Sequence, residues 1–445
     1  MRRAVVLAVL LLGAIPASAG ASAREIKIAS SKRLSARLMD FTLTTAAFDF
    51  HPHVRVLLPS RYAAHPRRRY PVLYLLHGSV DDAASWTAKG NAERLTAGLP
   101  LIVVMPSTTG KGNAGGWGSD WWNEGQGGPP RWETFTIDQL IPWVDTRYRT
   151  IRRRGGRAIA GLSMGGFNTM SHAARHPDLF AAASSYSGAV DTNYPGVQPV
   201  IQAETLGDGG RTPDSIWGPR SIYEINWRAH NPWDLAANLA GIALAIRTGN
   251  GQPGPYDNRS IGTDPIEYGV HEMSVSLHQR FNALHMGHVF DDYGPGTHSW
   301  PYWQRDLKRD LPRFMAVFRD PPDRPSPFTY RSAEPAFSVY GWQVKIRRQV
   351  AEFAELARAS ARGFTLRGSG SALVTTPRCY PARSVHALFV KGRRHVLRAD
   401  RSGRVHVTVT LGPSNTGQEF RPGSETKVYS ALVRIVGRRL SRCPT

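Results

Sequence analysis

Cysteine is scarce in this sequence of 445 residues, which contains only Cys379 and Cys443, both in the last quarter. The sequence has no zinc-finger spacing, and neither cysteine lies in a catalytic motif. In an exported protein, two such cysteines are typical of a disulfide, so we predict that Cys379 and Cys443 pair. Two unpaired thiols are the alternative.

Long hydrophobic segments are missing as well. The apolar run at residues 4–15 is too short for a helix of about 20 residues that crosses a bilayer, and no later segment is long and apolar enough. The run follows Arg2 and Arg3 and ends at Pro16 and the small residues ASAGASA. This pattern predicts that residues 1–23 are a signal peptide and that the protein is secreted or associated with the cell envelope. An uncleaved N-terminal anchor is the alternative.

Acidic residues are few. The sequence has 34 Asp and Glu residues but 56 Lys and Arg residues, which gives a formal net charge of +22. Such a charge favours anionic partners. No nucleic-acid-binding motif accompanies it, so nucleic acid is not a predicted partner. The arginines at 67–69 and 152–154 are interpreted as solvated loop ends, with adhesion to an anionic wall as a second reading. Neither a zinc-protease histidine pair nor a nucleotide-binding glycine loop is present, so no metal or cofactor is predicted.

What the sequence does contain is an alternation of buried strands and helices. Continuous apolar runs predict strands covered on both faces, at 67–78, 99–106, 156–162, 180–188 and 243–251. Helical spacing lies between them, at 132–148 and 167–177. This alternation predicts an α/β fold with a mostly parallel central sheet flanked by helices.

Three segments lack this pattern. Residues 24–35 are polar and predict a loose lead-in, while residues 190–235 are rich in Gly, Pro and Trp and predict an insertion over the active site. The segment DPPDRPSP at 320–327 is stiff and polar, which is typical of an interdomain linker.

The linker divides the chain into a predicted catalytic domain at 24–322 and a small β-rich domain at 328–445. Short alternating runs such as RVHVTVTLG and SALVRIVG predict a β-sandwich-like module in the second part. One helical stretch is predicted inside it, at about 344–361.

The sequence Gly161-Leu162-Ser163-Met164-Gly165 has the G-x-S-x-G pattern of a nucleophile elbow. It follows a predicted strand and opens a predicted helix, which is the context that the motif requires. We therefore predict the α/β-hydrolase fold with Ser163 as nucleophile. The backbone N–H of Met164 is one predicted oxyanion donor, and that of Ser79, after the buried strand that ends at His77-Gly78, is the other.

The triad order of this fold is serine, acid, histidine, so the histidine should follow the last strand. His298 has this place, after a Gly-Pro-Gly turn and before an aromatic helix start. Four carboxylates between Ser163 and His298 remain candidates for the acid: Asp257, Asp264, Glu267 and Glu272.

Several motifs resemble the esterase family that includes S-formylglutathione hydrolase, and within it the antigen 85 mycolyltransferases. The matching pieces are LYLLHG, Trp132-Glu133-Thr134-Phe135, GLSMGG, Trp217-Gly218-Pro219, Gly249-Asn250-Gly251 and Thr297-His298-Ser299-Trp300. Together they span roughly residues 55–318.

This resemblance implies a Ser–Glu–His triad with Glu267 as the acid and Glu272 in reserve, and oxyanion N–H groups on Ser79 and Met164. It also implies that Trp300 lies beside the acceptor site. The chain departs from antigen 85 at His77 and Val80, where those enzymes carry an aspartate and an arginine that help hold trehalose. His77 remains a substrate-binding candidate, but trehalose is not a predicted acceptor.

The leading hypothesis is therefore acyl transfer from an ester, or from a lipid or glycolipid substrate, to water or to a second alcohol through an acyl-enzyme. An inactive wall- or matrix-binding protein on a hydrolase scaffold is the alternative. In a third hypothesis the C-terminal module anchors the enzyme to a cell-envelope glycan.

Overall fold

The computed structural model describes residues 25–110, 114–207, 211–258, 262–440 and 443. The predicted signal peptide at 1–23 lies outside this part of the chain. Within it, no helix has the length and apolar character needed to cross a bilayer.

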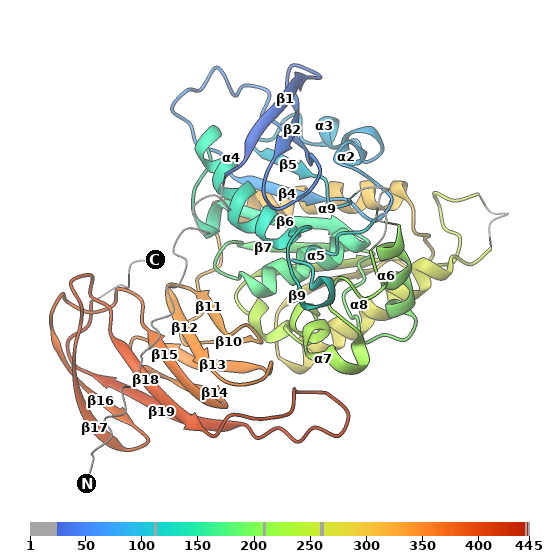
Figure 1. The fold of residues 1–445 in the computed structure, drawn as a ribbon. Coiled ribbons are helices and arrows are strands. Elements are labelled where there is room, and N and C mark those ends of the chain that lie inside the picture. The colour runs from blue at the N-terminus through green and yellow to red at the C-terminus, as the bar shows by residue number, and fades with distance from the viewer. Residues whose placement is uncertain (1–24, 111–113, 208–210, 259–261, 441–442, 444–445) are drawn as a thin grey trace, which may run out of the picture.

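A nine-stranded sheet forms the centre of the first part of the chain (Figure 1). Its strands are Lys27–Arg33 (β1), Leu38–Thr44 (β2), His53–Leu57 (β3), Val72–Leu76 (β4), Ile102–Pro106 (β5), Arg157–Leu162 (β6), Ala182–Tyr186 (β7), Ala243–Thr248 (β8) and His288–Asp292 (β9). They lie in the order β1-β2-β3-β5-β4-β6-β7-β8-β9, and all pairs from β5 to β9 are parallel. The predicted α/β-hydrolase fold is confirmed.

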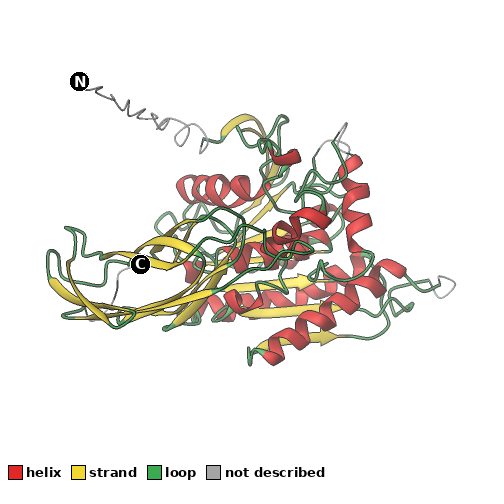
Figure 2. Cartoon of the chain, turned by 60° about the horizontal axis from the view of Figure 1, so that its bottom comes forward, coloured by secondary structure: helices red, strands yellow, loops and turns green. Residues whose placement is uncertain are grey.

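Helices cover both faces of this sheet, as Figure 2 shows. They are Ser85–Ala88 (α2), Ala92–Leu95 (α3), Ile141–Arg147 (α4), Met164–Arg175 (α5), Val197–Leu206 (α6), Arg220–His230 (α7), Pro265–Ala283 (α8) and Trp300–Arg319 (α9). Short helical turns occur at Asn123–Gly125 (η2), Arg154–Gly156 (η4) and Ala236–Leu239 (η5), and the π-helical segment Thr134–Leu140 (η3) leads into α4.

Strand β4 shows how the sequence fills the two faces. Leu73 and Leu75 pack into the cluster with α2, α3 and α9, whereas Val72, Tyr74 and Leu76 pack into the cluster with α4, α5 and α8. Since side chains alternate along a strand, an uninterrupted apolar run is what a strand buried on both faces requires.

Two antiparallel sheets form the last part of the chain. One has the order β10-β13-β14-β19-β16-β17, and the other has the order β11-β12-β15-β18. Their strands are Phe328–Ser332 (β10), Ala336–Val339 (β11), Trp342–Arg347 (β12), Ala354–Ser360 (β13), Gly363–Gly368 (β14), Gly370–Thr375 (β15), Val385–Val390 (β16), Arg393–Arg398 (β17), His406–Gly412 (β18) and Tyr429–Val436 (β19). Both sheets contribute to one apolar cluster, which also contains the disulfide between Cys379 and Cys443. These sheets, residues 328–436, are called the C-terminal module below.

The module packs closely against the hydrolase part. The side chain of Asn238 makes two hydrogen bonds with the backbone of Arg331, at 2.9 and 2.8 Å, and the Tyr330 hydroxyl donates to the carbonyl of Arg175 at 2.7 Å. Phe353, between β12 and β13, belongs to the apolar cluster of the hydrolase part.

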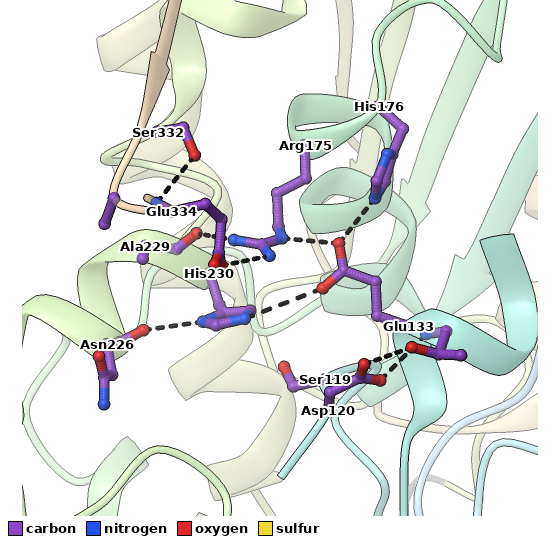
Figure 3. Close-up of polar contacts among 12 residues, drawn as sticks. Ser119, Asp120, Glu133, Arg175, His176, Asn226, Ala229, His230, Ser332 and Glu334 are labelled. Atoms are coloured by element: carbon purple, nitrogen blue, oxygen red, sulfur yellow. Dashed lines mark hydrogen bonds and ion pairs between the residues drawn. The ribbon is translucent and has the colours of Figure 1, made fainter. Parts of the chain in front are cut away.

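A buried charge cluster lies at this junction (Figure 3). The Glu133 carboxylate accepts from Arg175 Nε at 2.8 Å and from His176 Nε2 at 2.7 Å, and Arg175 also binds Glu334 of the module at 3.0 Å. Burial raises the pKa of Glu133, but Arg175 and His176 outweigh it and hold this pKa well below its usual range. Glu133 of the Trp132–Phe135 motif therefore contacts this junction.

Two sequence-based predictions about elements are wrong. Residues 344–361 do not form a helix but contribute to strands β12 and β13. Residues 24–35 are not a loose lead-in, because β1 pairs with β2 as an antiparallel edge. Residues 190–235, predicted as an insertion over the active site, contain the helices α6 and α7.

Candidate active site

Ser163 lies between the end of β6 and the start of α5, at the centre of the parallel sheet. Its backbone is strained, with φ 53° and ψ −124°, a conformation that residues with a Cβ rarely adopt. The N–H of Ser163 donates to the Tyr186 carbonyl at 3.0 Å, and its own carbonyl accepts from Gly166 and Phe167 of the first helical turn. These bonds hold the serine at a sharp strand-to-helix turn, as a nucleophile elbow requires.

Two positions of the elbow require glycine because other backbone atoms lie too close to leave room for a Cβ atom. A Cβ on Gly161 would lie 2.3 Å from the carbonyl oxygen of Gly165, and a Cβ on Gly165 would lie 2.4 Å from that of His77. Any side chain at either position would push β6, α5 or the loop after β4 apart.

His298 and Glu267 are in direct contact. His298 lies in the loop between β9 and α9, and its Nδ1 is 2.7 Å from Glu267 Oε2. Glu267 is completely buried in the first turn of α8 and also accepts from Ser187 Oγ and from the Gly249 N–H, both at 2.8 Å. An Nδ1–H bond to this carboxylate leaves His298 Nε2 unprotonated and able to accept a proton.

The other three candidate acids do not reach the imidazole. Asp264 caps α8 and accepts from the backbone N–H of His298 at 2.8 Å. Asp257 accepts from the hydroxyls of Thr297 and Tyr302, both at 2.6 Å. Glu272 contacts His271 at 3.2 Å and is partly exposed. The structure therefore brings Glu267 alone among the four to the His298 ring.

Ser163, His298 and the two candidate oxyanion residues line one pocket of about 800 Å³. The backbone N–H groups of Ser79 and Met164 donate to no other backbone group among the described residues. Ser163 and His298 are likewise not joined by a hydrogen bond within the described part of the chain; in unliganded hydrolases this bond often tightens only when substrate binds.

His77 is not among the residues that line the pocket. It is buried, and its Nδ1 lies 2.7 Å from the Gly78 carbonyl while its Nε2 accepts from the Thr108 N–H at 2.8 Å. Burial lowers its pKa, in keeping with a neutral ring that holds the loop bearing Ser79 against the loop after β5. The His77 ring thus contacts the backbone of these two loops rather than the pocket.

Trp300 lies at the rim of the pocket, with its ring edge-on to Trp86 and Trp303 at 5.2 and 5.4 Å between centres. Val80, on the opposite loop, is 76% exposed and also lines the pocket. The apolar side chains of the lining come mainly from α6 and α8, where Val197, Val270 and Met273 are buried and Val200 and Ile266 are exposed.

Glu204 of α6 is a polar residue of this pocket that sequence reasoning missed. Its carboxylate accepts from the Trp117 indole N–H at 2.7 Å. Burial raises its pKa, opposed by hydrogen bonds from Ser79 and Trp117. A Cβ added to Gly115 would lie 2.3 Å from the Glu204 carboxylate and 2.9 Å from Met164 Sδ, so this carboxylate is close to both candidate oxyanion residues.

The chain is similar to several known proteins. The Esterase family model matches residues 45–314. Esterase Rv1288 of Mycobacterium tuberculosis (strain ATCC 25618 / H37Rv) is 42% identical over 164 residues, which are 37% of this chain and 35% of that protein. The chain thus spans about a third of the length of this relative. Diacylglycerol acyltransferase/mycolyltransferase Ag85B of Mycobacterium leprae (strain TN) is 32% identical over 264 residues, covering 56% of this chain and 78% of that protein.

Solved structures show the same fold. MPT51 (FbpC1) of Mycobacterium tuberculosis superposes with a TM-score of 0.50 and 22% identity, over 62% of this chain and 97% of that one. An S-formylglutathione hydrolase from Agrobacterium tumefaciens superposes with a TM-score of 0.50 and 18% identity, over 65% and 99%.

Proposed function

Because the chain belongs to the esterase family, we propose that it is a serine esterase or acyltransferase with Ser163, Glu267 and His298 as its catalytic triad. The observation that carries this proposal is the 2.7 Å contact between His298 Nδ1 and the buried Glu267 carboxylate. His298 itself lines the same pocket as Ser163. Glu267 holds one tautomer of His298 and stabilises the imidazolium that forms during the reaction.

The proposed reaction has two steps. His298 Nε2 takes the proton of Ser163 while Oγ attacks the ester carbonyl, and the N–H groups of Ser79 and Met164 stabilise the oxyanion. The protonated His298 then gives its proton to the leaving alcohol, and an acyl-enzyme remains. Water or a second alcohol releases the acyl group by the reverse sequence.

The lining of the pocket supports an apolar acyl group. Apart from Glu204 and Tyr268, the side chains of α6 and α8 that line it are aliphatic or methionine, and a pocket of about 800 Å³ is within the usual range for a small-molecule site. We propose that the acyl chain of an ester or lipid lies along these side chains, and that the alcohol leaves past Trp300. Val80 offers no charged group to a sugar acceptor at the rim.

We also propose that the protein is exported and loses residues 1–23. The disulfide between Cys379 and Cys443 is in keeping with an oxidising compartment. N-terminal sequencing of the protein from culture medium would find a start at or just after residue 20 or 24 if this is right, and Met1 on the mature protein would contradict it.

Turnover of p-nitrophenyl esters from acetate to palmitate tests the proposed function. We expect the wild type to hydrolyse these esters, with a preference for acyl chains longer than acetate, and Ser163→Ala to lose about six orders of magnitude in kcat. Adding an alcohol acceptor would then separate transfer from hydrolysis. Equal rates for both proteins would contradict the serine mechanism, and no turnover of any ester by the wild type would favour an inactive binding protein.

A further inference from the structure

Positive charge is concentrated in the last quarter of the chain. Residues 328–445 hold 21 of the 56 Lys and Arg residues but only 6 of the 34 Asp and Glu residues, so they supply +15 of the formal +22. In the six-stranded sheet of the module, β10 contacts the hydrolase part, and β17 forms the opposite edge with only β16 as a described neighbour. Figure 1 shows β16 and β17 at the end of the module far from the hydrolase part.

The strands near this edge present a regular outer face. Strand β16 lies between β17 and β19. Phe389 of β16 pairs with Arg394 of β17 and Arg434 of β19, and Ala387 pairs with Val396 and Val436 in the same way. Val385 of β16 pairs with Arg398 of β17. His386 and Leu388 of β16 point the other way and are buried, so the residues of these pairs lie on the outer side. We call this surface the arginine–valine face, defined by Arg394, Arg398, Arg434, Val385, Val396 and Val436.

The valines of this face are unusually exposed for aliphatic side chains. The exposed fractions of Val396, Val385 and Val436 are 58%, 55% and 49%. Exposed apolar side chains that lie next to one another mark interaction sites more often than isolated ones do.

The arginines of this face have no acidic partner among the residues that the structure describes. Strands β16, β17 and β19 contain no Asp or Glu, and no ion pair within the described part of the chain involves Arg394, Arg398 or Arg434. Charged residues on an edge strand also prevent the strand from pairing with another sheet. This protective role explains the arginines but not the valines exposed beside them.

We propose that the arginine–valine face docks the protein onto a lipid bilayer that contains anionic phospholipids. Guanidinium groups bind lipid phosphates in bidentate fashion, and the valines between them can enter the boundary between head groups and acyl chains. A soluble anionic polymer would satisfy the arginines but would offer no apolar phase to the valines. The combination therefore favours a bilayer surface, and this inference does not depend on the proposed ester chemistry.

Co-sedimentation with vesicles tests the proposal. The protein would be the chain from residue 24 onward, because the apolar run at 4–15 would itself bind lipid. Vesicles of phosphatidylcholine alone would be compared with vesicles that also contain phosphatidylglycerol. The first variant replaces Arg394, Arg398 and Arg434 with glutamate, and the second replaces Val385, Val396 and Val436 with serine. The control replaces the exposed Arg67, Arg152 and Arg153 of the hydrolase part with glutamate, which changes the net charge equally.

We expect binding to phosphatidylglycerol vesicles only, weakened about a hundredfold or more by the arginine variant and about tenfold by the valine variant, with little change for the control. Unchanged thermal unfolding midpoints would show that the variants are folded. Equal losses in the arginine variant and the control would overturn the proposal in favour of diffuse charge. Full binding by the valine variant would overturn it in favour of a polyanion site, and absence of wild-type binding would overturn it outright.

Discussion

Three carboxylates contact the loop that carries His298, each at a different group. These contacts distinguish the candidate triad acid from the other two carboxylates. Asp264 holds the backbone of His298, Asp257 holds Thr297, and Glu267 alone holds the imidazole. Asp264 also accepts from the N–H of Glu267 at 3.2 Å, so one N-cap aligns both partners of the His298–Glu267 bond. The order of these contacts could not be read from spacing, since all four acids lie in the same stretch before His298.

Replacement of Glu267 by glutamine is the most direct test of this arrangement. Glutamine keeps the shape but cannot stabilise the imidazolium and favours the wrong tautomer, so kcat should fall by about 10³- to 10⁴-fold. Ser187, Thr248 and Gly249 all donate to the same oxygen, Oε1, which glutamine can keep. Its NH2 group would then face His298 in place of Oε2, so folding stability should change much less than kcat. Kinetics on a short-chain ester would be measured beside urea unfolding.

Glu272→Gln is the matched control, since Glu272 lies on the same helix but contacts His271 rather than His298. We expect its kcat to stay within about twofold of the wild type. A large loss for Glu272→Gln with little loss for Glu267→Gln would reverse the assignment.

A second prediction for a single residue concerns Glu204 and the pH dependence of kcat/KM. Since burial raises its pKa, the carboxyl is neutral over a wider acidic range than usual and gains its charge as the pH rises through that raised value. A negative charge beside Ser79 and Met164 opposes the oxyanion of the transition state. Glu204→Gln removes this charge and should therefore gain in kcat/KM relative to the wild type as the pH rises.

The ratio of kcat/KM for Glu204→Gln to that of the wild type would be measured from about pH 5 to about pH 9. The ratio should rise with pH by up to roughly 3- to 10-fold, a gain expected from removal of one partly screened charge. A ratio that stays near 1 over this range, or that falls with pH, would mean that the carboxylate does not oppose the reaction.

At the scale of elements, the turn between β6 and α5 depends on contacts that a single methyl group would break. In Gly165→Ala the new Cβ would meet the His77 carbonyl at 2.4 Å, where backbone must move. We expect a loss of about 1–3 kcal/mol in the free energy of unfolding and a large loss of turnover, because His77 leads into the loop of Ser79. Urea unfolding and ester kinetics check both effects.

Gly287→Ala controls for the loss of backbone freedom, since its Cβ would meet no atom within 4 Å. A Gly165→Ala protein as stable and active as Gly287→Ala would show that the loop after β4 yields easily. In that case the two elbow glycines would not be explained by close packing.

Helices and strands were predictable where local pattern and tertiary packing agree. The strands β4, β5 and β6 are continuous apolar runs buried on both faces, so their sequence admits few other structures. Residues 354–360, AELARAS, have strong helix formers, yet they form β13 because β10 and β14 pair with them on either side. Strand β1 was missed for a different reason. It is a mostly polar, exposed strand at the sheet edge, so its sequence has no hydrophobic periodicity that would predict a strand.

The pocket wall was the least predictable part of the site. Helix α6 joins it through Val197 and Val200, but its segment follows Gly- and Pro-rich sequence with no clear periodicity. Glu204 therefore had no motif to mark it, and only its spatial contact with Trp117 identifies it. Ser163 and His298 could be proposed from the sequence because a strand, a turn and a loop order constrain their positions more strongly than they constrain a pocket wall. These constraints left four acids open, and Glu267 was favoured among them only by the family resemblance.

At the scale of the whole molecule, the two parts of the chain share contacts that make them interdependent. Asn238 pairs with the backbone of β10, and Phe353 completes the apolar cluster of the hydrolase part. Removal of the module would leave these groups without partners. Its role in localisation is therefore better tested by surface variants such as those of the arginine–valine face than by truncation.

The charge cluster at the junction should carry much of this coupling (Figure 3). Arg175, whose side chain is 12% exposed, joins Glu133 to Glu334, so Arg175→Met would leave the buried Glu133 carboxylate with histidines alone. Loss of one partner of a buried ion pair costs about 3–5 kcal/mol, whereas Glu334, whose side chain is 45% exposed, should contribute less than about 1 kcal/mol. Urea unfolding followed by tryptophan fluorescence should therefore show a large loss of stability for Arg175→Met and a small one for Glu334→Gln. Equal small losses would mean that the parts are held together by apolar contacts and backbone hydrogen bonds, and that the cluster only fills the space between them.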